Sequence, residues 1–193
     1  SMTWYIHKYF YNRSILDGYT LRLIREIMET HEKRKFEKII EEIKVLKGSI
    51  SKTDVYAKAI FVEPLLDFII KDFENFRILN EDSTVGAMVV CDSSEQASMM
   101  NKIFKEKYLN KTLKDESDMS FNNKLLEKHK IKSGALILHD EGTKIERKSV
   151  IESFKDGEID IIFVNRMLLT GFDAPRLKKL YLARKIESHN LLQ

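Results

Sequence analysis

The spacing of hydrophobic residues changes character near residue 80. From Ser14 to Leu46, Leu and Ile recur at helical spacing among Lys, Arg and Glu, which predicts an amphipathic helix or helices. A break at Gly48–Ser51 precedes a second helical stretch from Tyr56 to Phe73, and we expect Pro64 within it to kink the helix or to begin a new one. The pattern predicts helical hairpins packed on a neighbouring structure.

From Thr84 onward, short apolar runs alternate with helical segments. The first of these runs, Val85 to Cys91, has the length and continuity of a strand buried on both faces. The predicted strands are 85–91, 134–139, 159–164 and 179–183. Alternation of strands with helices predicts an α/β fold, a doubly wound parallel sheet with helices on both faces, preceded by a helical segment. We divide the chain into a helical linker or accessory segment, 1–80, and an α/β domain, 81–193.

Two pairs of polar residues mark helix starts between these strands. Ser93 and Gln96 have the spacing of a capping box, and so do Thr143 and Glu146. The helices that they open are predicted to end near Tyr108 and Phe154.

Composition narrows the class of protein. The chain has 193 residues and a formal net charge of +3, which is compatible with a nucleic-acid partner. Its one cysteine, Cys91, excludes an internal disulfide and a cysteine-based metal site. No apolar run reaches the roughly 18 residues of a membrane span, and no signal-peptide pattern opens the chain. We therefore expect a cytoplasmic protein that does not contact a membrane.

The glycines and histidines exclude several common sites. A phosphate-binding P-loop needs two glycines five residues apart, and a dinucleotide-binding turn needs two glycines two apart. Neither spacing occurs among the glycines at positions 18, 48, 86, 134, 142, 157 and 171. The five histidines show no His-x-x-x-His spacing, so we expect no metal ligands.

The remaining polar candidates follow the predicted strands, where parallel sheets bind their ligands. Thr170 and Gly171 can offer a hydroxyl and an approachable backbone N–H to a phosphate oxygen. Asp173, two residues before Pro175, is a suitable acceptor for ribose hydroxyls. The alternative is structural: Gly171 takes a left-handed turn and Asp173 caps the next segment.

Ser93 and Ser94 offer a second candidate. They stand at a predicted helix N-terminus, where a phosphate can bind to the positive end of the helix dipole. The alternative is an ordinary helix cap.

Taken in order, these segments resemble the second RecA-like motor domain of superfamily-two helicases and translocases. The resemblance comprises a strand and Ser-containing loop, a strand ending in His, a helix carrying Arg, a Phe-x-x-Gly, a strand and a Thr-Gly-x-Asp-x-Pro loop. The corresponding segments are Val89–Ser94, Leu138–His139, Glu146–Arg147, Phe154–Gly157, Ile161–Val164 and Thr170–Pro175.

Three segments make the resemblance more specific. The run MLLTGFDAPRLKKLYL from Met167 to Leu182, followed by HNLLQ from His189, looks like the restriction (motor and nuclease) subunit R of type I restriction-modification enzymes. The segment SILDGYTLRLIRE, Ser14 to Glu26, resembles the part of that family that links the first motor domain to the second.

The resemblance implies a subunit that translocates double-stranded DNA with ATP and cleaves it at a distance, an ATP-dependent type I site-specific endodeoxyribonuclease. It implies ATP and Mg²⁺ as cofactors of the full subunit, with none expected to bind this fragment. The implied partners are double-stranded DNA, the first RecA-like domain and nuclease domain of the same subunit, and the methylase and specificity subunits.

The resemblance also implies roles for single residues. Thr170 and Gly171 would couple the DNA backbone to the nucleotide, and Asp173 would reach the ATP ribose. Ser93 and Ser94, with Thr170, would contact phosphates of the tracked strand. The ATP-binding loop belongs to the first motor domain, and the arginine finger is expected just beyond Gln193. We therefore expect no catalytic residue in this fragment, and neither ATP hydrolysis nor DNA cleavage by it alone.

Other interpretations remain open at this point. The chain can be the second motor lobe of another superfamily-two DNA or RNA helicase. It can also be a non-enzymatic flavodoxin-like or receiver-like binding module, although a receiver needs an acidic pair after its first strand and Asp92 stands alone. The helices of the first eighty residues can carry an interaction of their own, but we expect them to pack on the motor domain.

Overall fold

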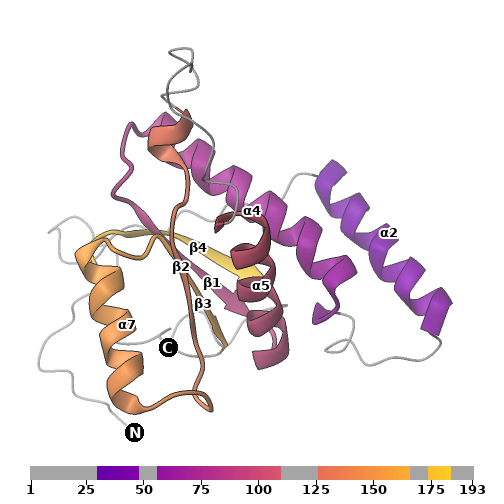
Figure 1. Cartoon of the computed structure of the whole chain (residues 1–193). Coiled ribbons are helices and arrows are strands. Elements are labelled where there is room, and N and C mark those ends of the chain that lie inside the picture. Colours follow the sequence, from indigo (N-terminus) through magenta and orange to yellow (C-terminus); the bar gives the residue numbers. More distant parts are fainter. Residues whose placement is uncertain (1–29, 48–55, 110–125, 166–173, 184–193) are drawn as a thin grey trace, which may run out of the picture. The chain divides into compact units, whose positions relative to one another are not determined.

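The computed structural model describes residues 30–47, 56–109, 126–165 and 174–183. The chain divides into two compact units, 1–35 and 36–193, and the second contains every described strand. The described elements, labelled in Figure 1, are α2 (Thr30–Lys47), α4 (Ala59–Leu79), β1 (Gly86–Cys91), α5 (Ser94–Lys107), β2 (Gly134–Ile137), α7 (Lys144–Asp156), β3 (Ile161–Asn165) and β4 (Leu177–Ala183).

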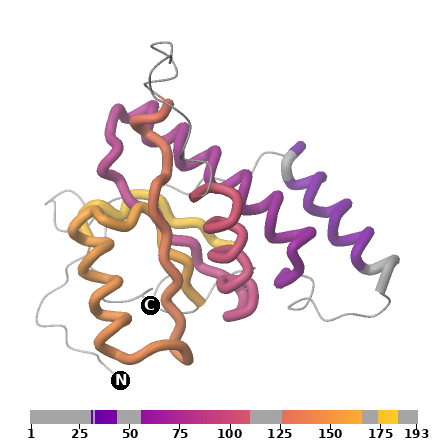
Figure 2. The backbone as a smooth tube through the Cα atoms, in the orientation of Figure 1, coloured from indigo at the N-terminus to yellow at the C-terminus, as the bar shows by residue number. Residues whose placement is uncertain are grey.

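The four strands form one parallel sheet in the order β2-β3-β1-β4. The chain leaves β1, passes through α5 to the edge strand β2, and returns through α7 to β3, which lies between them. Figure 2 follows this path along the backbone. The predicted strands are confirmed with shifts of one to two residues at their ends, and so is the doubly wound α/β sheet.

Alternate residues of the central strands face opposite layers of helix. Met88 and Val90 of β1 pack with Phe154 of α7 in one cluster. On the other face, the Phe163 ring of β3 lies 5.8 Å from the Phe104 ring of α5. Figure 1 shows α7 on one side of the sheet and α4 with α5 on the other. Because both faces are covered, all six residues of β1 are buried.

Pro64 lies inside α4 and does not begin a helix, so that part of the prediction is wrong. The helix has already formed ahead of it, because Lys58 O accepts hydrogen bonds from the backbone N–H groups of Phe61 and Val62, both at 2.9 Å. A proline at this position removes the bond to the carbonyl of Ile60. Ile60 is 49% exposed, so water can hydrate that carbonyl.

Helix α7 has the predicted capping box. Thr143 Oγ1 accepts from the backbone N–H of Glu146, and the Glu146 carboxylate accepts from the backbone N–H of Thr143. The helix continues two residues beyond the predicted end at Phe154. Gly157 then ends it in the left-handed conformation, with φ of 91°, which glycine adopts without strain.

Helix α4 packs against both α5 and the sheet, as expected of the second helical stretch. Asp72 of α4 accepts from Lys179 Nζ at 3.0 Å and from the Tyr181 hydroxyl at 2.6 Å, which joins α4 to β4. The Phe36 ring of α2 meets the Phe61 ring of α4 edge-on, 5.7 Å between centroids. The division of the chain at residue 80 stays a prediction, and the helix predicted from Ser14 lies outside the described residues as far as residue 29.

Candidate functional site

The carboxyl ends of β1 and β3 lie side by side, because Cys91 and Asn165 are partners in the parallel ladder. Beyond Cys91, the chain turns through Asp92 and Ser93 into α5. The topology therefore brings the start of a helix to the carboxyl edge of the sheet, where parallel sheets bind their ligands. Of the predicted site residues, Ser93 lies in this turn and Ser94 is the first residue of α5.

Ser93 serves as the N-cap of α5. Its backbone is extended, and its Oγ accepts from the backbone N–H of Gln96 at 3.1 Å. The Gln96 side chain reaches one residue further back than in a standard capping box, because its Oε1 accepts from the backbone N–H of Asp92 at 2.7 Å. Ser93 is 9% exposed, so its side chain is largely enclosed in this turn. The alternative role as a cap is therefore present in the structure.

Ser94 has different surroundings from its neighbour. It is the first residue of α5 and is only partly buried. Its Oγ accepts a hydrogen bond from Asn165 Nδ2 at 3.2 Å, across 71 residues of sequence. Sequence reasoning missed Asn165. The only available signal was its position as the first polar residue after the apolar run of β3.

The carboxyl end of β2 carries a further polar loop. The Arg147 guanidinium of α7 donates through Nη1 to the carbonyls of His139, Glu141 and Gly142, at 2.8 to 3.1 Å. The His139 ring lies 3.2 Å from the Asp140 carboxylate, and both side chains are strongly exposed. Arg147 therefore holds the loop that leads from β2 to α7.

The remaining predicted site residues cannot be placed relative to Ser93 and Ser94. Thr170, Gly171 and Asp173 lie outside the described residues, and their roles stay predictions. The connection that contains them leaves the carboxyl edge at Asn165, and Ala174 to Arg176 lie at the amino edge, where Arg176 O accepts from Gly86 N at 2.8 Å.

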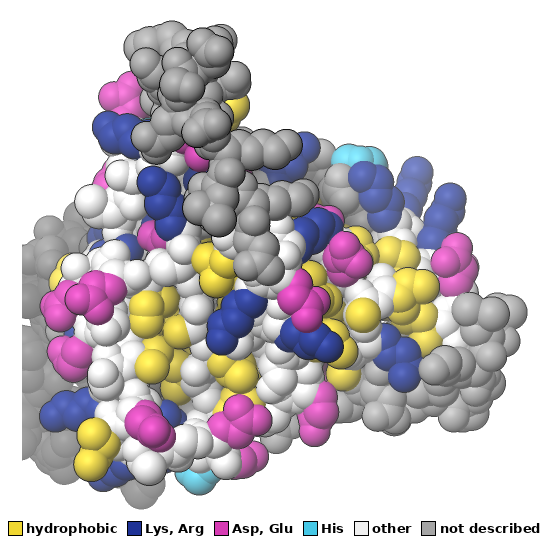
Figure 3. All heavy atoms as spheres, viewed as in Figure 1, with side chains coloured by type: hydrophobic (Ala, Val, Ile, Leu, Met, Phe, Trp, Pro, Cys, Tyr) yellow, Lys and Arg dark blue, Asp and Glu magenta, His cyan; other side chains and the backbone are white. Residues whose placement is uncertain are grey.

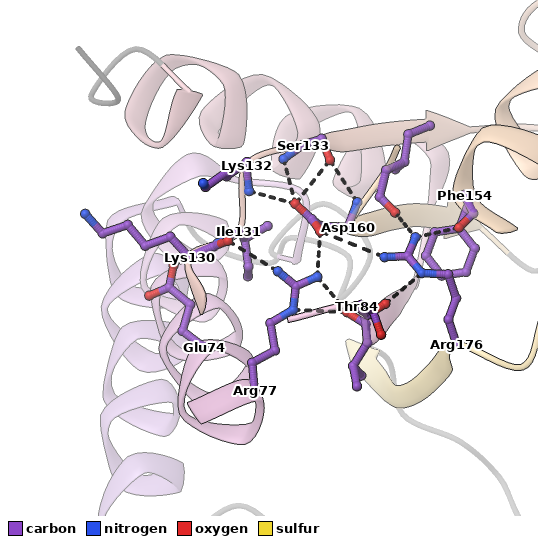
Figure 4. Close-up of polar contacts among 12 residues, drawn as sticks. Glu74, Arg77, Thr84, Lys130, Ile131, Lys132, Ser133, Phe154, Asp160 and Arg176 are labelled. Carbon is purple, nitrogen blue, oxygen red and sulfur yellow. Dashed lines mark hydrogen bonds and ion pairs between the residues drawn. The ribbon is translucent and has the colours of Figure 1, made fainter. Parts of the chain in front are cut away.

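A second polar cluster, also missed from the sequence, lies at the amino edge of the sheet (Figure 4). The Arg77 side chain of α4 is 1% exposed, and its Nη2 lies 2.6 Å from Asp160 Oδ1. Asp160 Oδ2 accepts from the backbone N–H groups of Lys132 and Ser133 and from the Ser133 hydroxyl. Arg176 lies on the other side, with Nη2 3.9 Å from Asp160 Oδ1.

This amino-edge cluster ties the starts of the four strands together. Arg77 donates to the carbonyl of Val85 ahead of β1, and Arg176 donates to the carbonyl of Thr84. Arg176 also stacks over the Phe154 ring, 5.0 Å from its centroid. The two guanidinium groups share the Asp160 carboxylate and donate their remaining hydrogen bonds to backbone carbonyls, which is the arrangement of a structural ion-pair cluster.

The surface view in Figure 3 shows side chains of both charges interspersed over the face that it presents. Within the described residues, no three His, Cys, Asp or Glu side chains come together as metal ligands. No helix in the same part of the chain is long and apolar enough to cross a membrane.

Comparison with known proteins decides the family. A family model for domain 3 of the type I restriction enzyme subunit R matches residues 56–193. This chain belongs to that family. The resemblance carried by the LLTGFDAP run is thereby confirmed, and the match selects it from the three interpretations that the sequence left open.

Two relatives of this subunit R domain come from Methanocaldococcus jannaschii. The protein named as the MjaVIIP endonuclease subunit of a type I restriction enzyme is 30% identical over 178 residues, which cover 87% of this chain and 15% of the relative. The MjaVIIIP endonuclease subunit is 27% identical over 221 aligned positions, covering 98% of this chain and 21% of the relative. The chain thus spans about a fifth or less of the length of these relatives.

Among solved structures, the helicase domain of Hef from Pyrococcus furiosus overlaps with 80% of this subunit R chain and 30% of its own chain. The TM-score is 0.44 and the sequence identity 15%.

Proposed function

We propose that this domain is the second, RecA-like motor lobe of the ATP-dependent subunit that translocates and cleaves DNA in a type I restriction enzyme. In this role the carboxyl edge of the sheet contacts the phosphate backbone of double-stranded DNA. Support comes from the family match over residues 56–193 and from the parallel sheet, which brings the start of α5 beside the end of β3. The observation that carries the proposal is the placement of Ser94 at this edge.

Ser94 is suited to donate a hydrogen bond to a phosphate oxygen. It opens α5, and the positive end of the helix dipole favours an anion there. Its Oγ accepts from Asn165, and within the described residues no acceptor takes its proton. Ser93, by contrast, is enclosed by its capping bond. Of the two serines, Ser94 is therefore the stronger candidate for the DNA contact, while a contact by Ser93 stays a prediction.

Neighbouring carboxylates limit how much this contact adds to affinity. Asp92 and Glu95 flank the two serines and repel a phosphate. A neutral hydroxyl releases no counterion when it binds, so it adds little to the salt-dependent part of DNA affinity. Contacts of this kind fix the position of the backbone and carry no sequence information, which suits a motor that moves over any sequence.

The nucleotide chemistry of the proposed motor falls mainly on other parts of the subunit. This sequence holds no P-loop, and the described residues hold no cluster of metal ligands for Mg²⁺. Contacts to ATP by Thr170, Gly171 and Asp173 remain part of the proposal. The ATP and Mg²⁺ sites, the first RecA-like domain, the nuclease domain, the methylase and specificity subunits and the cytoplasmic location are proposed with it.

The DNA contact is tested with Ser94→Ala in the full-length subunit R that carries this domain. Loss of one hydrogen bond should raise the KM for duplex DNA in the DNA-stimulated ATPase roughly three- to tenfold, with kcat retained. Ser98→Ala, one helical turn further along α5, is the matched control and should leave the KM unchanged. Equal KM values for the Ser94 variant and the unaltered subunit would contradict the contact.

The nucleotide roles have a separate test. Thr170→Ala and Asp173→Ala in the full-length subunit should each lower DNA-stimulated ATP turnover while leaving the thermal unfolding midpoint unchanged. The isolated 193-residue chain should show no ATP turnover, because it lacks a triphosphate cradle. Turnover by the purified chain that follows its concentration would refute that statement.

A further inference from the structure

Asn165 ends β3 directly beside the turn that carries Ser94. We propose that Asn165 is a positioning residue that directs the Ser94 hydroxyl proton outward, toward the DNA phosphate. This inference rests on the proposed function, because it explains why the Ser94 hydroxyl would donate its proton to the DNA phosphate. Asn165 lies outside the Thr-Gly-x-Asp-x-Pro motif, so that motif assigns it no role.

The hydrogen-bonding capacity of a serine hydroxyl limits what the Ser94 side chain can do. The group has one proton to donate and two lone pairs that accept. The Asn165 amide donates to Ser94 Oγ from 3.2 Å and so occupies a lone pair. The hydroxyl proton is thereby left for another acceptor. A phosphate oxygen is an acceptor only, so a serine held in this way matches it.

An acidic residue at position 165 would reverse this polarity. A carboxylate is an acceptor only, so it would take the Ser94 proton and turn the hydroxyl away from an incoming anion. Asparagine has nearly the same shape as aspartate and carries no charge. The choice between these two side chains therefore decides whether Ser94 donates to a ligand or to the protein itself.

The amide side chains of Asn165 in β3 and Gln96 in α5 each have one atom that is unpaired among the described residues. Asn165 Oδ1 and Gln96 Nε2 are buried atoms, and neither has a hydrogen-bond partner among the residues that the structure describes. The other amide atom of Gln96, Oε1, accepts from Asp92 N in the β1–α5 turn. A buried amide atom without a partner costs about 1–3 kcal/mol of stability. Such atoms call for an explanation in a native fold, and one explanation is completion by a ligand or partner. Asn165 carries one of these atoms on the amide that bonds Ser94, so a ligand or partner bound at this edge could complete it.

Helix capping does not explain the hydrogen bond between Asn165 and Ser94, because Ser94 is not the cap of α5. Ser93 caps α5, with its Oγ bound to the N–H of Gln96. Ser94 follows it as the first helical residue, and within the described residues its side chain forms a hydrogen bond only with Asn165. Among the described residues, the Asn165 amide bonds to Ser94 alone, so its effect can be tested as a coupling between the two residues.

The test measures the affinity of the full-length subunit R for a short duplex of mixed sequence, by fluorescence anisotropy, in four proteins: unaltered, Ser94→Ala, Asn165→Ala and the double variant. Both single changes should weaken binding roughly three- to tenfold. The double variant should bind no more weakly than Ser94→Ala, because Asn165 acts through Ser94. Asn101→Ala and Ser98→Ala in α5 serve as controls of the same residue types and should bind normally.

Asn165→Asp gives a second readout that preserves side-chain size. It should weaken binding further than Asn165→Ala, because its carboxylate takes the Ser94 proton and also repels phosphate. It keeps the shape of the β3 terminus, so it reports on binding even where Asn165→Ala loses the fold. Normal affinity in Asn165→Asp would overturn the positioning role.

The outcomes separate the two proposals. Weak binding by Ser94→Ala with normal binding by Asn165→Ala overturns the inference and leaves the proposed DNA contact standing. Additive losses in the double variant also overturn it, because they show that Asn165 acts independently of Ser94. Normal binding by Ser94→Ala itself overturns the proposed contact. Equal and non-additive losses support both.

Discussion

The Arg77 guanidinium of α4 and the Asp160 carboxylate ahead of β3 form a buried ion pair, with 2.6 Å between Nη2 and Oδ1. The two residues are 83 positions apart in the sequence. Arg77 also donates to the Val85 carbonyl, and its guanidinium lies 4.7 Å from the centroid of the Phe73 ring. The pair therefore connects the end of α4 to the amino edge of two neighbouring strands.

Removing the cation should destabilise the domain strongly. Arg77→Met removes the nearer cation from Asp160, which keeps Arg176 at 3.9 Å, and it removes the Arg77 donors from the Val85 carbonyl. We therefore expect a loss of roughly 3 kcal/mol in the free energy of unfolding, the lower end for a broken buried ion pair. Urea unfolding of the chain measures it. Lys155→Met, which breaks an exposed pair with Glu152 within α7, is the control and should cost less than about 1 kcal/mol. Similar losses in both variants would contradict a special role for Arg77.

Gly86 should tolerate no side chain. A Cβ added there would lie 2.6 Å from Cζ of the Phe154 ring, which packs against the start of β1. Gly86→Ala should therefore lower the free energy of unfolding by roughly 1–3 kcal/mol through overpacking. Replacing the ring by a smaller side chain, Phe154→Leu, should recover part of that loss in the double variant Gly86→Ala/Phe154→Leu. Losses that simply add would show that the ring is not the source of the strain.

The thiol of Cys91 should be unreactive in the folded chain. Burial raises its pKa from about 9 to about 12, and its Sγ lies 3.7 Å from Met100 Sδ in the core. The reactive thiolate is therefore scarce at pH 8 and the sulfur is inaccessible. Alkylation followed by mass spectrometry should proceed only as fast as the chain unfolds and should become rapid in denaturant. Rapid alkylation under native conditions would show that the β1 core opens.

The capping box of α7 should give the chain a dependence on acid pH. Hydrogen bonds from Thr143 hold the pKa of Glu146 below its ordinary value. A carboxyl whose folded pKa is lowered stabilises the fold above the unfolded value of 4.5, and the contribution is lost as pH falls through the folded pKa. The unfolding midpoint of Glu146→Gln should thus lie below that of the unaltered chain at pH 7. The two should converge in acid, and a constant difference at all pH values would contradict this account.

Local features of the sequence were sufficient to predict the strands and the helix starts of the sheet domain. The continuous apolar run of β1 marked a strand because a strand covered on both faces needs no polar side chains, and all six residues of β1 are buried. The Thr143–Glu146 pair marked the start of α7 because a capping box uses only neighbouring residues. Pro64 was misleading, since a proline early in a helix loses a single backbone bond, and only the fold shows whether water can replace it.

The polar contacts at the two edges of the sheet were not available from the sequence. Arg77 left one trace, because it follows Phe73 by four residues on the apolar face of α4 and so had to be buried with a partner. Nothing local indicated that the partner was Asp160. Asn165 gave a weaker signal in the sequence, since a polar residue at the end of an apolar strand is common.

By itself, the sequence determined the strands, the helix starts and the family, because each depends on residues close together along the chain. Only the tertiary structure decided that β3 lies between β2 and β1, since the order of parallel strands depends on how their helices pack. That order sets Asn165 beside Ser94 and Asp160 beside Arg77. Hydrogen bonds act over about 3 Å, so the chemistry of both edges exists only once the sheet has assembled.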